Sequence, residues 1–184
     1  WLQEGKKGEV RLLFGARGAG KTSFLNTVTT LSTHVAKVDV LRASGELDGA
    51  FQLYSWVFRD LHQRLTGKAP PADVGPEQLE SALPADGRPV ILIDNLDRFI
   101  DNPDPKLLRR FFELSQGNLE RLKSRALVVI SATTRWQEIL GSGDFTYLNP
   151  GSYMELARFS AADTHELLAK RLELSGSRFD RVFG

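Results

Sequence analysis

GARGAGKT, at residues 15–22, directly follows the apolar run VRLLF at residues 10–14 and leads into a helix-forming stretch. Its outer glycines, lysine and threonine satisfy the pattern G-x-x-x-x-G-K-[ST], which binds phosphate when it joins a strand to a helix. In that setting the backbone N–H groups of the loop and the positive end of the helix converge on one point. The sequence therefore predicts a loop that holds a di- or triphosphate, rather than a plain glycine-rich turn.

Each polar group of this loop has an expected role. We expect Lys21 to reach the β and γ phosphates and Thr22 to place its hydroxyl on Mg²⁺, a hard cation that prefers oxygen ligands. Gly18 relieves crowding within the loop. The predicted nucleotide-binding residues of the loop are Gly15, Gly18, Ala19, Gly20, Lys21, Thr22 and Ser23.

Apolar runs and helical patterns alternate along the rest of the chain. Helices are predicted between the strands from apolar residues that recur at three- and four-residue spacing, and residues 161–174 read as a final helix. Strands alternating with helices favour a parallel sheet covered by helices on both faces. Residues 66–88, rich in Pro and Gly, are the best candidate for a mobile insertion. The predicted strands lie at about residues 9–14, 35–41, 89–93, 126–132 and 152–157.

A carboxylate ends the third of these runs. In RPVILIDNLDRF, at residues 88–99, Asp94 follows four apolar residues. A parallel strand would carry it to the carboxyl edge of the sheet, where open α/β sheets bind their ligands. Asp94 is therefore predicted to hold Mg²⁺, through water, opposite Thr22.

The pair GARGAGKTSFLN and VILIDNLDRF resembles the KAP and STAND groups of P-loop ATPases, which are related to AAA+ proteins. The resemblance implies that Asp97 orients or deprotonates the attacking water. Position 95 is Asn where many AAA+ proteins have a catalytic Glu, and Arg98 matches the DDLDR form of KAP proteins. Membrane helices that often separate the first two motifs in KAP proteins are missing from this sequence. The asparagine predicts slow hydrolysis.

The fourth apolar run ends in ALVVISATTRW, at residues 126–136, and its TTR is similar to a STAND signature at the same place. The resemblance implies that Thr134 contacts nucleotide and that Arg135 or its neighbours sense the γ-phosphate. A planar guanidinium suits that role because it reads phosphate oxygens well. An ordinary helix start with a solvated arginine remains the alternative.

The amino-acid composition limits the partners, the chemistry and the cellular location that can be expected. The net charge is +1, so nothing global favours nucleic acid or a membrane surface, and there is no Cys for a disulfide, thiolate site or nucleophile. The apolar runs are too short to cross a membrane. We expect a cytoplasmic protein. Basic residues on the helix that contains Lys106, Arg109 and Arg110 could meet nucleic acid, but interleaved glutamates favour a solvated face.

The fold prediction is an α/β, three-layer P-loop NTPase domain with a mainly parallel five-stranded sheet of order 5-1-4-3-2, the order being implied by the resemblance. Residues 1–160 are expected to form the ATPase core and residues 161–184 the start of a truncated lid or helical subdomain of a longer protein. The predicted function is Mg²⁺-dependent ATP binding and slow hydrolysis, as a switch or motor module with other domains as partners and homo-oligomerisation open. A non-hydrolysing nucleotide-binding scaffold and a small-molecule P-loop kinase remain alternatives, whereas a GTPase is disfavoured because no base-reading N-K-x-D segment occurs.

Overall fold

The computed structural model describes residues 9–43, 47, 49–87, 89–96, 105–133, 148 and 153–174. Within them a five-stranded sheet has the order β2-β3-β4-β1-β5, and every pairing between neighbours is parallel. Read from the other edge, this is the predicted order 5-1-4-3-2. The strands are β1 (Val10–Phe14), β2 (Val35–Asp39), β3 (Val90–Asp94), β4 (Leu127–Ser131) and β5 (Tyr153–Glu155).

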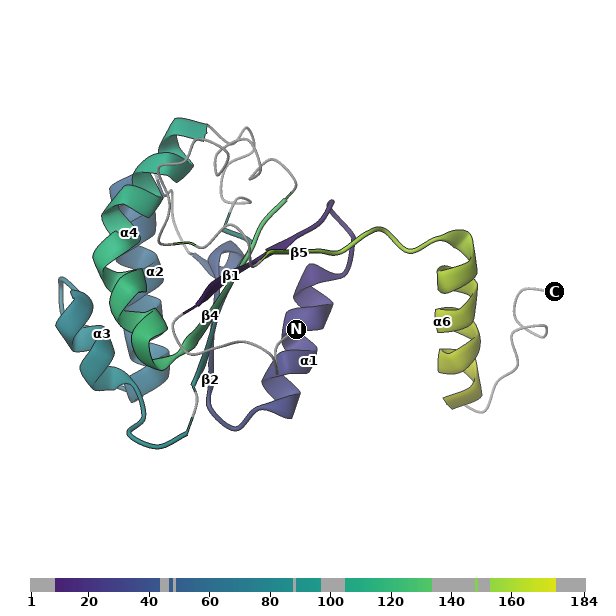
Figure 1. The fold of residues 1–184 in the computed structure, drawn as a ribbon, viewed down its shortest axis with the longest axis horizontal. Helices are drawn as coiled ribbons and strands as arrows, with labels where there is room; N and C mark the ends of the chain where they lie inside the picture. The colour runs from purple at the N-terminus through teal and green to yellow at the C-terminus, as the bar shows by residue number, and fades with distance from the viewer. Residues whose placement is uncertain are drawn as a thin grey trace.

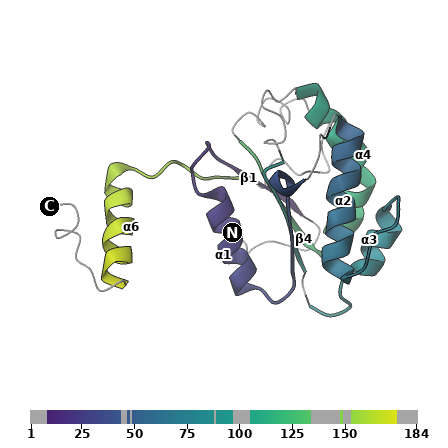
Figure 2. The ribbon, with the colours of Figure 1, turned by 180° about the vertical axis from the view of Figure 1, so that it is seen from behind.

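Helices cover both faces of the sheet (Figure 1). Of the described helices, α1 covers one face and α2, α3 and α4 cover the other, as Figure 2 shows from behind. This three-layer arrangement follows from the crossover connections that a parallel sheet requires. The helices are α1 (Lys21–Leu31), α2 (Ala50–Thr66), α3 (Pro76–Ala82), α4 (Pro105–Arg125) and α6 (Ala161–Leu174), with a short 3₁₀ helix η1 (Val40–Arg42) after β2.

Side chains along each strand point alternately to the two faces of the sheet, so the core is divided into two clusters. On β3, Ile91 and Ile93 pack into the larger cluster beneath α2, α3 and α4, whereas Leu92 packs into the smaller one beneath α1. Every residue of β1, β3 and β4 is buried, as expected for strands covered on both sides. Asp94, two residues after Leu92, therefore belongs to the face that α1 covers.

The described part of residues 66–88, expected as the best candidate for a mobile insertion, packs into the core instead. Val74, Leu79 and Leu83 are buried in the larger cluster. The guanidinium of Arg125, at the end of α4, donates to the backbone carbonyls of Glu80 and Pro84. Pro and Gly residues mark the bends of this segment, while its few apolar residues attach α3 to α4.

Helix α6 follows β5 and lies apart from the sheet in both views (Figures 1 and 2). It begins with a reciprocal cap: the Asp163 carboxylate accepts from the Ser160 backbone N–H at 2.9 Å, and the Asp163 N–H donates to Ser160 Oγ at 3.1 Å. Leu167 and Leu168 are exposed. Among the described residues, no helix combines the length and apolar character of a membrane span.

Candidate functional site

The glycine-rich loop joins the end of β1 to the start of α1, as predicted. Its first residue, Gly15, lies against β5: a Cβ built there would sit 2.6 Å from the backbone oxygen of Leu156. The Leu156 N–H in turn donates to the carbonyl of Phe14 at 2.7 Å. Only glycine fits at position 15 without moving the backbone at Leu156, directly after β5, so this glycine is fixed by packing.

The later glycines of the loop are explained by backbone conformation rather than by packing. Gly18 and Gly20 have φ of 83° and 88°, and no described atom beyond their chain neighbours lies within 4 Å of a Cβ built at either position. Gly20 is the N-cap of α1 and offers no side-chain cap, and the first turn of α1 contains no acidic residue. The start of α1 therefore has neither a side-chain cap nor an acidic residue of its own to satisfy its N–H groups, which is the arrangement that suits a phosphate.

Lys21 folds back over the loop. Its ammonium donates to the carbonyl oxygens of Gly15 at 2.5 Å and Ala16 at 3.1 Å. Contact with β and γ phosphates, as predicted for this lysine, would replace these carbonyls with phosphate oxygens. Of the other predicted loop residues, Ala19 is buried, Thr22 is partly buried and Ser23 is exposed at the start of α1.

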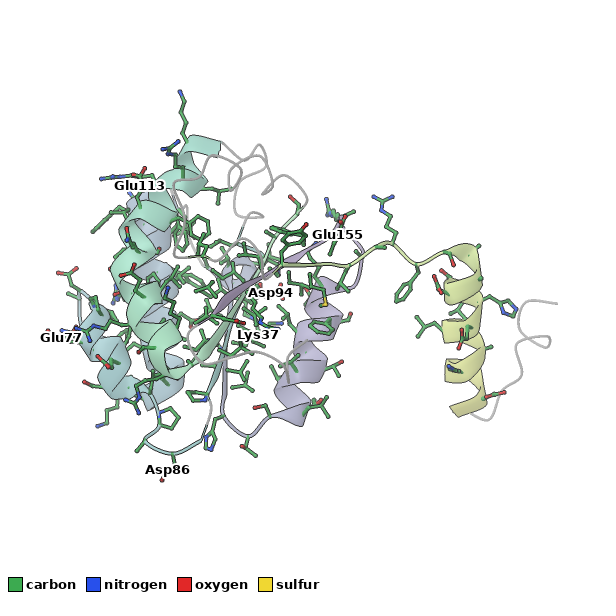
Figure 3. All side chains as sticks on the ribbon, in the orientation of Figure 1. Lys37, Glu77, Asp86, Asp94, Glu113 and Glu155 are labelled. Carbon is green, nitrogen blue, oxygen red and sulfur yellow. The ribbon has the colours of Figure 1, made fainter. Side chains whose placement is uncertain are left out.

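Asp94 ends β3 at the carboxyl edge of the sheet, with no exposed side-chain surface. Its Oδ1 accepts a 2.5 Å hydrogen bond from Ser131 Oγ, at the end of neighbouring β4. Its Oδ2 lies 3.0 Å from the Lys37 ammonium of β2, at a distance typical of an ion pair. Oδ2 nevertheless accepts no hydrogen bond from the described residues. Figure 3 shows Lys37 and Asp94 close together at the centre of the domain.

Asn95 extends this cluster. Its φ of 60° is in the left-handed region, which asparagine tolerates better than most residues. Its backbone N–H donates to Ser131 Oγ at 3.1 Å, and its amide donates to Asp39 Oδ1 at 2.9 Å. The residue is 5% exposed, and its side chain is bound to the end of β2. An amide held in this way does not act as a general base.

Three of these side chains were not identified from the sequence as site residues: Lys37, Ser131 and Asp39. Each is a polar residue in or at the end of an otherwise apolar strand, and each lies on the edge or face next to Asp94. A polar residue inside a strand of a sheet covered on both faces was the available signal. Of the remaining predicted site residues, Asp97, Thr134 and Arg135 lie outside the described residues.

The residues present fit Mg²⁺. Thr22 and Asp94 supply oxygen ligands from the helix start and the sheet edge, and the buried Asp94 Oδ2 accepts no hydrogen bond from the described residues, although the Lys37 ammonium lies 3.0 Å away. No group of three or more His, Cys, Asp or Glu side chains capable of holding a metal occurs in the described part of the chain. A few protein oxygens beside a phosphate loop suit Mg²⁺, which keeps several waters and binds with substrate phosphates.

A parallel sheet of this order, with a glycine loop running from β1 into α1 and an aspartate ending β3, defines the P-loop class of nucleoside triphosphatases. Residues 6–140 match the AAA domain family, and the chain belongs to that family. A search of curated protein sequences finds no match.

Solved structures share the fold at low sequence identity. The Aeropyrum pernix ORC2 protein, in ADPNP and ADP complexes, has a TM-score of 0.54 at 14% identity over 91% of this chain and 46% of its own. CDC6P from Pyrobaculum aerophilum has 0.54 at 17% identity, over 90% and 43%. The Walker-type ATPase PABY2304 of Pyrococcus abyssi has 0.53 at 14% identity, over 96% and 57%. The chain thus spans about half the length of the structures it matches.

Proposed function

We propose that this domain binds ATP with Mg²⁺ and hydrolyses it slowly, as a nucleotide switch or motor module of a larger AAA+-like protein of the KAP or STAND type. The observation that carries the proposal is the start of α1: an open glycine loop and an acid-free first turn, at the same sheet edge as the buried Asp94. Such a site offers N–H donors and a lysine to phosphates and a carboxylate to their metal ion.

The roles of the residues follow from their chemistry. Lys21 would bind the β and γ phosphates, and Thr22 and Asp94 would hold Mg²⁺ between them. When bound, Mg²⁺ would neutralise charge on the phosphates during transfer. Asp97 would orient the attacking water and Arg135 would contact the γ-phosphate; both assignments rest on the resemblance to KAP and STAND proteins.

Slow turnover is proposed because the cluster at the end of β3 offers a buried amide where many AAA+ proteins have a glutamate. The Asn95 amide donates to Asp39 and so has its own partner within the fold. The same contact is the specific observation that favours the second candidate, a scaffold that binds nucleotide without hydrolysing it. Phosphate release separates the two.

A role within a larger protein is supported by the comparison of lengths, since the chain spans about half of each matched structure. Nucleotide binding gains support from the Aeropyrum pernix ORC2 protein, whose structure holds ADPNP and ADP.

Nucleic-acid binding gains no support from helix α4. Arg109 and Arg110 there pair with Glu113, and the hydrogen bond from Arg110 lowers the pKa of that carboxyl. This face is a mixed ionic surface rather than a purely basic one.

Titration with a fluorescent ATP analogue in MgCl₂ tests the phosphate loop. Lys21→Ala should weaken binding at least about tenfold because it removes a charged hydrogen-bond donor from the phosphates. Lys170→Ala is the matched control: this lysine pairs with Glu166 on α6 and should leave affinity unchanged. Equal affinity of the folded Lys21→Ala and wild-type proteins would refute the assignment. Phosphate release by the wild-type chain should stay below about 1 s⁻¹, the low end of ordinary turnover.

A further inference from the structure

Lys37 is a charged residue on a covered face of the sheet. In β2, Ala36 and Val38 pack into the larger core cluster, so Lys37 between them points to the opposite face, beneath α1. Its side chain is only 16% exposed. The ammonium lies between two oxygens, 2.7 Å from Asn26 Oδ1 of α1 and 3.0 Å from Asp94 Oδ2 of β3.

Asp94 needs such a neighbour. A carboxylate with no exposed surface is costly unless charge and hydrogen bonds compensate it. Ser131 supplies one hydrogen bond to Oδ1. Oδ2 accepts no hydrogen bond from the described residues, but the positive charge of Lys37 lies 3.0 Å from it and offsets its charge.

We propose that Lys37 is an internal counter-charge for Asp94 that competes with Mg²⁺ for this carboxylate, and that Asn26 holds the ammonium when Mg²⁺ and nucleotide bind. The inference rests on the proposed function, and it makes Lys37 a positioning residue that acts through Asp94. It assigns regulation of the metal requirement to a residue outside the phosphate loop and the acidic strand end.

The physical reason is repulsion between cations. An ammonium 3.0 Å from Oδ2 would repel a metal ion held by the same oxygen. Lysine has a flexible stem, and its alternative partner on α1 already accepts a hydrogen bond. Lys37 therefore orients Asp94 before binding, and it lowers the affinity of the site for Mg²⁺ that arrives without phosphates.

The test measures the dissociation constant of a fluorescent ATP analogue in EDTA and in MgCl₂. The magnesium gain is the value in EDTA divided by the value in MgCl₂, so a larger gain means that Mg²⁺ strengthens binding more. Lys37→Met removes the competing charge while keeping an unbranched stem, so the magnesium gain should rise about tenfold. Lys37→Arg keeps the charge and should stay within about threefold of wild type. Lys170→Met, on α6, is the control for loss of a lysine and should not change the gain.

Asn26→Ala provides a second test with no change of charge. Asn26 lies exposed on α1, and its removal takes away the oxygen that would hold the ammonium once Mg²⁺ takes Asp94, so the magnesium gain should fall about threefold. If Lys37→Met does not fold, this variant decides alone. A magnesium gain equal to wild type in folded Lys37→Met, or in Asn26→Ala, would overturn the inference while leaving nucleotide binding intact. Absence of saturable binding by wild type would refute the proposed function, and the inference with it.

Discussion

Ser131→Ala is expected to destabilise the domain strongly, although it removes a single oxygen. Ser131 Oγ donates to Asp94 Oδ1 at 2.5 Å and accepts from the Asn95 backbone N–H at 3.1 Å. The serine and the aspartate are both fully buried. The substitution therefore leaves a buried carboxylate with one fewer donor and a buried N–H without its acceptor.

The loss of these two hydrogen bonds sets the expected decrease in the free energy of unfolding. A hydrogen bond to a charged group contributes about 2 kcal/mol, and a buried N–H left unsatisfied costs about 1 kcal/mol or more. Together they predict a loss of about 3 kcal/mol in the free energy of unfolding. For a domain of this size, that corresponds to a fall of about 6–12 °C in Tm.

Ser115→Ala is the matched control for this measurement. Ser115 is equally buried, but its hydroxyl donates to the Phe111 carbonyl within α4. That carbonyl lies one helical turn earlier and can keep its backbone partner, so the cost should stay below about 1 kcal/mol.

The assay measures the free energy of unfolding by urea denaturation. It includes Ser131→Ala, Ser115→Ala, Asp94→Asn and the double variant Ser131→Ala/Asp94→Asn. The double-mutant cycle should show a coupling of at least about 1 kcal/mol between Ser131 and Asp94. Equal destabilisation by Ser131→Ala and Ser115→Ala, or additive effects in the cycle, would refute the view that the hydroxyl compensates the buried carboxylate.

Three further predictions concern other parts of the domain. Asp94→Asn should impair Mg²⁺-dependent ATP binding, whereas Asp97→Asn should preserve binding and lower phosphate release; untouched hydrolysis in both would make this strand end structural. Gly15→Ala should lower the free energy of unfolding in urea by about 2 kcal/mol or more because its Cβ meets the Leu156 oxygen at 2.6 Å. The Ser160 hydroxyl lowers the pKa of Asp163 below the usual 3.8, so the α6 cap should be fully formed above that pH and lost as pH falls through the lower native value; NMR shifts unchanged down to pH 2 would contradict this.

Local signals predicted much of the fold. The apolar run before the phosphate pattern became β1, and the helix-forming residues after it became α1, with Lys21 as its first residue. Strand, loop and helix are continuous in sequence there, so local chemistry determines the geometry. The run VILID likewise predicted β3 with its aspartate at the carboxyl edge.

The end of β2 shows where local signals failed. A strand was predicted at about residues 35–41, but β2 stops at Asp39, and the chain turns into η1. The Asp39 carboxylate accepts from the Leu41 N–H at 3.2 Å and also from the Asn95 amide. The first contact is a local cap, whereas the second spans 56 positions of sequence, so no local pattern could reveal the tie to the end of β3.

Lys37 was missed for a related reason. In VAKVD the alternation of small, apolar and charged residues also fits a strand with one face in water. The face toward α1 is covered in the folded domain, so the same lysine becomes a partly buried partner of Asp94. Burial depends on which helix crosses which face, and that is a property of the sheet order rather than of the strand.

Asn95 has a different meaning in the sequence and in the fold. In the sequence, Asn95 stands where many AAA+ proteins have a catalytic glutamate, and the expected consequence is slow hydrolysis. In the fold this asparagine contributes to structure, because it adopts φ of 60° at low cost, its N–H binds Ser131 Oγ, and its amide holds the carboxylate that caps η1. A glutamate there would meet the Asp39 carboxylate and strain the backbone. Asn95 therefore belongs to a network that fixes the ends of β2, β3 and β4 around Asp94, and a water-activating group, if the domain has one, must come from another residue.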